Sequence, residues 1–286
     1  MVLESILSPI TAEDKRYRLI ALGFLFCLVA AGLSFMVWES YVSLLMVFLT
    51  AMAAIPLIYN IIKYEEEKDL QDLEEKILLK EHWKALSAFM YLFLGIIFAV
   101  TVMYSILPWD TVTHMFSVQT ETLQGISGSV TGMTLMKQIH TLGVVFFNNI
   151  KVLIFSILFS FIFGAGAIFV LTWNGFIIGT AIGNFIRSNL ALYSDLIGFN
   201  AAAKYFHVIS LGLLRYSIHG IPEILAYFTA ALAGGIISVA VIRHDLGTAK
   251  FEHIILDSAD LLLLSVGLLA LAALLEVFIT PIVFPI

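Results

Sequence analysis

Three titratable residues lie in the most apolar parts of the chain. His219 and Glu223 stand at the head of a long run without charge, and Glu276 is flanked by leucines in another such run. A carboxylate that stays charged and alone inside a bilayer costs several kcal/mol. We therefore expect these side chains to face the interior of a helical bundle and to meet one another there. Neutral donors and acceptors at the starts of two other apolar segments complete this predicted polar cluster, namely Asn148, Asn149 and Asn174.

One imidazole and two carboxylates suit three kinds of chemistry. His219, Glu223 and Glu276 could bind a divalent metal ion such as zinc, carry a proton or an ion, or form a hydrogen-bonded cluster that orders the helices. The spacing matches no recognised metal signature, and the chain has no H-E-x-x-H motif of a metallopeptidase. The sequence therefore favours the structural cluster, an activity other than catalysis, and no required cofactor.

Pro222 lies between His219 and Glu223 and affects where the helix that carries them begins. Proline is tolerated best in the first turn of a helix. We therefore expect a helix to begin at residues 220–222, with His219 just before it and Glu223 in its first turn. The other histidines that we considered are expected to be solvated in loops or flanks, namely His82, His114, His140 and His253.

Small residues recur at intervals of four in two apolar segments. Gly175, Gly179 and Gly183 form one series, and Gly234 belongs to a second that continues from Ala226. Lipid provides no hydrophobic force between helices, so helices associate where small residues let their backbones approach. We interpret both series as packing faces within one subunit, with a dimer face or a narrow conduit as the alternatives.

The composition indicates an all-α, polytopic membrane protein. Apolar residues make up 60% of the chain and charged residues 13%, with a mean hydropathy of +1.00. A spanning helix needs about 20 mostly apolar residues, which predicts spans near 19–37, 41–62, 88–106, 150–171, 222–242 and 259–280. A shorter glycine-rich segment, 174–186, is either a re-entrant or tilted element or part of a longer helix. The total is six or seven spans, and we favour seven.

Net charge and cysteine content exclude other classes of function. The net charge of −6 gives no support to nucleic-acid binding, which needs a basic patch. The single cysteine, Cys27, excludes an intrachain disulfide framework and a metal site with several cysteines.

Three connecting segments differ from the spans. Residues 63–84 are rich in acidic residues and lysine, with apolar residues at helical spacing, which predicts an amphipathic helix outside the bilayer. Residues 107–149 predict an irregular connection followed by a helix from about Leu135. Residues 187–218 predict a half-apolar helix lying at the interface. We expect residues 1–87 to form a membrane hairpin with this acidic helix, and residues 88–286 to form the core.

Basic residues near the spans predict the orientation in the plasma membrane. Lys15, Arg16 and Arg18 precede the first span, which places the N-terminus in the cytoplasm. Arg187, Lys204 and Arg215 would then lie outside, against the usual bias.

Four motifs in order resemble the stage II sporulation protein M family. They are a paired-Asn helix start, an Asn-Gly after the next span, a His-Gly-x-x-Glu and a late Glu before Thr-Pro. The family pattern falls on Asn148, Asn149, Asn174, Gly175, His219, Gly220, Glu223 and Glu276. The resemblance covers roughly residues 88–284, and residues 1–87 resemble an elaboration of archaeal members.

The resemblance implies a membrane component without catalysis of its own, which holds other envelope proteins at the membrane. The sporulation role itself is not transferred, since many relatives occur in organisms that do not sporulate. The expected partners are therefore the lipid bilayer, a second copy in a homodimer and other membrane or envelope proteins, with ion or solute transport as the alternative function.

Overall fold

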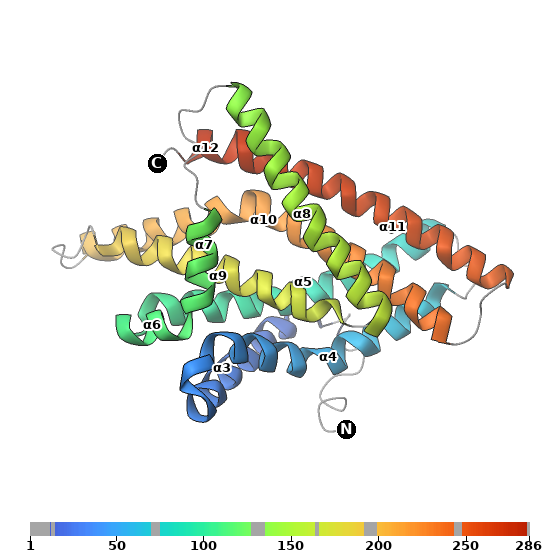
Figure 1. Ribbon diagram of the computed structural model, residues 1–286, viewed down its shortest axis with the longest axis horizontal. Helices are drawn as coiled ribbons and strands as arrows, with labels where there is room; N and C mark the ends of the chain where they lie inside the picture. Colours follow the sequence, from blue (N-terminus) through green and yellow to red (C-terminus); the bar gives the residue numbers. More distant parts are fainter. Residues whose placement is uncertain are drawn as a thin grey trace.

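The computed structural model describes residue 12 and residues 15–69, 75–126, 135–163, 166–191, 199–242 and 248–284. These residues form helices and no strand (Figure 1). The elements are α3 (Arg18–Val37), η1 (Glu39–Tyr41), α4 (Val42–Asp69), α5 (Glu75–Ile106), α6 (Trp109–Met115), α7 (Ser117–Ile126), α8 (Leu135–Phe163), α9 (Ala167–Ala191), α10 (Phe199–Ile242), α11 (Ala249–Leu274), the π-helical turn η2 (Leu275–Ile279) and α12 (Thr280–Val283). The predicted all-α fold is confirmed.

Seven helices of the described part are long and apolar enough to cross a membrane. They are α3, α4, α5, α8, α9, α10 and the continuous run from α11 through α12. The favoured count of seven is therefore confirmed. The glycine-rich segment 174–186 lies in the middle of α9, so it is part of a longer helix and supplies the seventh crossing.

The predicted span 150–171 is wrong. Helix α8 begins at Leu135, as expected, but ends at Phe163, and α9 begins at Ala167. The apolar composition continues across this boundary, so hydropathy alone does not reveal it.

The expected helix start at Pro222 is also wrong. Helix α10 runs without interruption from Phe199 to Ile242 and contains Pro222. An interior proline removes one backbone hydrogen bond, and membrane helices tolerate this loss when neighbouring helices surround them. In agreement, α10 contacts α4, α5, α8, α9 and α11 (Figure 1). The predicted interfacial helix in 187–218 is instead divided between the end of α9 and the start of α10, with residues 192–198 outside the described part.

The charged segment 63–84 does not form a separate helix in the described residues. Its first part continues α4 to Asp69, and its last part opens α5 at Glu75; residues 70–74 lie outside the described part. The connection after Leu107 is more regular than predicted, because it begins with the short helices α6 and α7.

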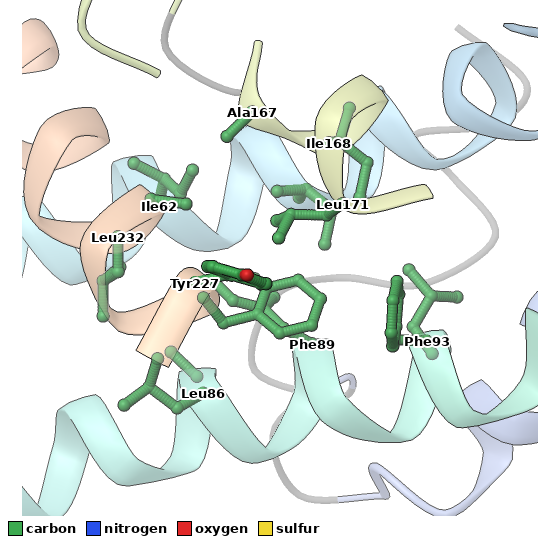
Figure 2. Packing of buried hydrophobic residues seen from close by; sticks show 14 of the residues in the cluster. Ile62, Leu86, Phe89, Phe93, Ala167, Ile168, Leu171, Tyr227 and Leu232 are labelled. Atoms are coloured by element: carbon green, nitrogen blue, oxygen red, sulfur yellow. The ribbon is translucent and has the colours of Figure 1, made fainter. Parts of the chain in front are cut away.

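A tightly packed apolar core fixes the middle of α10 against α4, α5 and α9. The ring of Phe228 lies 5.6 Å from that of Phe89 and 5.3 Å from that of Phe93. Figure 2 shows this region, to which Ile62, Leu86, Phe89, Phe93, Ala167, Ile168, Leu171, Tyr227 and Leu232 contribute. Because α4, α5 and α9 pack against α10, the position of α10 in the bundle is fixed. The side chains on its other faces are therefore fixed as well.

Candidate functional site

Two of the predicted titratable residues lie on one face of α10, together with a tyrosine. His219, Glu223 and Tyr227 are each four residues apart on the uninterrupted helix, so their side chains follow one another along it. The Tyr227 hydroxyl donates a hydrogen bond to Glu223 Oε1 at 2.8 Å. The sequence analysis missed Tyr227, although its spacing from Glu223 was a usable signal. Its ring lies in the core (Figure 2), which links the core to the cluster.

The π-helical turn η2 presents the remaining members of the cluster. Thr280, which follows it, donates a hydrogen bond from Oγ1 to the Leu275 carbonyl oxygen at 3.0 Å. The same Oγ1 lies 3.4 Å from Nδ1 of His219, a long contact in which a protonated Nδ1 would be the donor. Single π turns inside α-helices are frequent at functional sites. Here the turn places Glu276 and Thr280 beside α10, with which η2 is in contact.

The two glutamates belong to elements that contact each other, Glu223 to α10 and Glu276 to η2. Within the described residues neither carboxylate forms an ion pair. Two carboxylates that share one site can hold a proton or a cation between them.

The cluster lies along the candidate span of α10 rather than at its start. The part of α10 that is long and apolar enough to cross a membrane runs from Ala203 to Ile242. Glu223 lies near the middle of this stretch.

The three asparagines are distributed over different environments. Asn149 is buried on α8, whereas its neighbour Asn148 is exposed. Asn174 donates from its side chain to the Val170 carbonyl oxygen of its own helix at 2.9 Å. Of the predicted cluster, the structure therefore places Glu223 and Glu276 on contacting elements and His219 next to Thr280.

The donor arrangement does not form a ready metal site in the described part of the chain. No three His, Cys, Asp or Glu side chains of these residues are placed to hold one ion. His219 meets the Thr280 hydroxyl, while Glu223 accepts a hydrogen bond from Tyr227. The metal interpretation of His219, Glu223 and Glu276 stays a prediction.

The glycines of α9 lie against α5 within one chain. A Cβ at Gly175 would come within 2.8 Å of the Phe93 ring, and one at Gly179 or Gly183 within 2.7 Å of Val100 or Tyr104, respectively. Gly234 of α10 lies similarly close to the Ile157 carbonyl oxygen of α8. These close approaches lie inside the bundle, so they position α10 and the cluster.

A second buried polar group, missed in the sequence, joins α4 to α5. Glu65 is fully buried and accepts a hydrogen bond from Lys68 Nζ at 2.5 Å. Nδ1 of His82 lies 2.9 Å from the other Glu65 oxygen, and only 3% of His82 is exposed. The expectation of a solvated His82 is therefore wrong, because the charged segment around it packs as part of the two long helices.

The seven apolar helices and the buried polar cluster define a multi-pass integral membrane protein. The family model described as "Stage II sporulation protein M" matches residues 87–281. The chain belongs to this family, and the resemblance found in the sequence is confirmed. No curated protein and no solved structure matches the chain.

Proposed function

We propose that this protein is a non-enzymatic scaffold of the cell membrane, which holds a partner through a helical bundle organised by the polar cluster. The observation that carries the proposal is the contact between His219 of α10 and Thr280, which opens α12 after the π turn. Glu223 finds its hydrogen-bond donor within α10, in the Tyr227 hydroxyl. Polar pairing between helices stabilises their association in lipid, where an unpaired polar group is costly.

We place the N-terminus in the cytoplasm, since Lys15, Arg16 and Arg18 precede α3. Seven crossings then bring the C-terminus outside. Arg187, which runs against the charge bias in this orientation, has a local structural role. It donates to the carbonyl oxygens of Tyr104 and Leu107 at 3.0 and 2.8 Å, groups that the end of α5 leaves without helical partners.

The second candidate function is proton or cation translocation. One observation favours it, namely that Glu223 and Glu276 lie in contacting elements of two candidate spans and have no ion-pair partner in the described residues. Carboxylates in such positions often belong to proton relays. The interior proline of α10 and the π turn η2 lie beside them, as interruptions do in many transporters.

Reconstitution into liposomes separates the two candidates. Purified wild type, Glu223→Gln and Glu276→Gln are placed in vesicles containing a pH-sensitive dye, and a proton gradient is imposed. Glu252→Gln, at an exposed glutamate near the start of α11, is the matched control. The scaffold proposal expects leakage equal to that of protein-free vesicles for all four proteins. Proton flux by the wild type and the control that both cluster variants lose would replace the scaffold with the transporter.

The scaffold proposal also makes a positive prediction about binding. A photo-crosslinking residue is placed at Phe206, which is 75% exposed on the outer part of α10, and irradiated in native membranes. We expect a discrete adduct whose yield falls when Thr280→Val loosens the end of α11. The absence of any adduct, here and at further exposed positions of α10, would count against a partner-holding role.

A further inference from the structure

Helix α8 has two faces of different character, and one of them packs inside the bundle. The inner face carries Asn149, Leu153, Ser156 and Ser160, all of which are buried. Ser160 Oγ donates a hydrogen bond to the Ala231 carbonyl oxygen of α10 at 2.6 Å. The close approach of Gly234 to Ile157 lies one turn away on the same contact.

The outer face of α8 is exposed and carries two polar side chains, Asn148 and Lys151. They stand three residues apart, so they are neighbours on the helix surface. Phe147 and Phe155 flank them and are 64% and 54% exposed. Within the part of the chain that the structure describes, neither Asn148 nor Lys151 makes a hydrogen bond or an ion pair.

Lys151 lies in the central part of the candidate span Leu135–Ile162. The polar residues Lys137, Gln138 and His140 place the first turns of α8 near one bilayer surface. Phe163, the last residue of the helix, is roughly 18 Å from Lys151 along the axis. A lysine in the central part of a spanning helix costs about 2.5–3.5 kcal/mol when it faces lipid. A polar group that covers this face would remove that cost.

We propose that the outer face of α8 binds the α8 helix of a second copy of this chain. Lys151 of each copy donates to the side-chain oxygen of the partner's Asn148, and the reverse bond follows from the two-fold axis. A donor and an acceptor one turn apart on the same face are self-complementary, which is the requirement of a two-fold interface. Interhelical hydrogen bonds of this kind hold membrane helices together. The exposed aromatic rings of Phe147 and Phe155 form the apolar part of the contact.

This interface lies on a different face of the bundle from the Glu223–Glu276 cluster, and it does not rest on the proposed function. A dimer is compatible with a scaffold and with a transporter. The result of the vesicle flux experiment therefore does not decide it.

Cysteine crosslinking tests where the copies meet. Cys27 is the single cysteine and is buried, so Cys27→Ala provides a background in which Val144→Cys or Leu158→Cys is added on the exposed face of α8. Leu33→Cys, at a residue with 48% exposure on α3, is the matched control. Oxidation in membranes is expected to give covalent dimers for the α8 variants and not for α3. Crosslinking at α3 alone, or at none of the three positions in chains that remain folded, overturns the proposal.

The polar pair is tested by dimer affinity in vesicles, measured by energy transfer between labelled copies at several protein-to-lipid ratios. Lys151→Leu and Asn148→Ala are each expected to raise the dissociation constant about tenfold. Leu264→Ala, at an exposed leucine of α11, is expected to leave it unchanged. A monomeric wild type at all ratios, or an unchanged affinity in both polar variants, contradicts the assignment. Circular dichroism of each variant excludes unfolding as the cause.

Discussion

Gly23 of α3 and Gly95 of α5 lie against each other's helix backbones in a reciprocal contact. A Cβ at Gly23 would collide with the Leu92 carbonyl oxygen, and a Cβ at Gly95 with the Ile20 carbonyl oxygen. Backbone atoms cannot move aside as the end of a flexible side chain can. The crossing of α3 and α5 therefore depends on both residues having no side chain.

Gly23→Ala and Gly95→Ala are expected to destabilise the protein by about 1–3 kcal/mol each, the usual cost of overpacking a well-packed contact. Thermal unfolding in detergent, followed by circular dichroism, measures the effect. Gly32→Ala on α3 is the control, because a Cβ there meets nothing within 4 Å. It should be neutral or slightly stabilising, since alanine favours helix. Equal losses at all three positions would contradict this account of the crossing.

Tyr227→Phe removes the donor to Glu223 without changing the ring that packs in the core. A buried acceptor that loses its partner costs about 1–3 kcal/mol, so a fall in thermal stability of that size is expected. Glu223→Gln keeps an oxygen that the Tyr227 hydroxyl can reach and removes a carboxylate from the apolar interior. It should therefore be less damaging than Tyr227→Phe. The reverse order would show that the carboxylate, rather than its hydrogen bond, stabilises the cluster.

Glu65→Ala removes an acceptor that Lys68 and His82 share at the junction of α4 and α5. Breaking a buried ion pair by deleting one partner usually costs roughly 3–5 kcal/mol. Glu67→Ala, at an exposed glutamate on the same helix, provides the comparison and should cost much less. Unfolding measured side by side tests this, and similar values for the two variants would mean that the buried group adds little.

Elemental analysis of the purified protein tests the metal interpretation directly. We expect no stoichiometric divalent metal in the wild type, because the described residues place no three suitable side chains around one point. About one equivalent of a divalent metal per chain, lost in both His219→Ala and Glu276→Gln, would establish a metal site. It would also favour transport over the scaffold function. Retention of that metal in both variants would locate it elsewhere.

Hydropathy predicted the number of crossings, because a bilayer imposes a minimum length on each helix. The start of α8 at Leu135 was predicted instead from the end of the Thr-, Ser- and Gly-rich stretch before it. Hydropathy failed at the boundary between Phe163 and Ala167, because the residues there, F-G-A-G-A, include no charged or polar side chain. It also failed at Pro222, where contacts with five other helices outweigh a local preference. The preference of a single residue for a helix start is therefore a weak guide where several helices pack around it.

The candidate site was predicted in part, and the residues that were missed were missed for two different reasons. His219, Glu223 and Glu276 were found because a titratable group in an apolar run is conspicuous. Tyr227 and Thr280 were missed because their side chains are ordinary in membrane helices until the partner is known. His82 was missed for the opposite reason, since it stands in a charged segment that folds into the bundle.

The start of the family match at residue 87 falls inside α5, which begins at Glu75 and ends at Ile106. A recombinant protein cut at that point would lack roughly the first three turns of this helix, including His82. It would also lack the helix that fits against Gly95. The limit of sequence similarity is therefore a poor place to divide this polypeptide. Any version made of the matched region alone would have to offer the uncovered side of α5 to lipid or fill it with a helix from elsewhere.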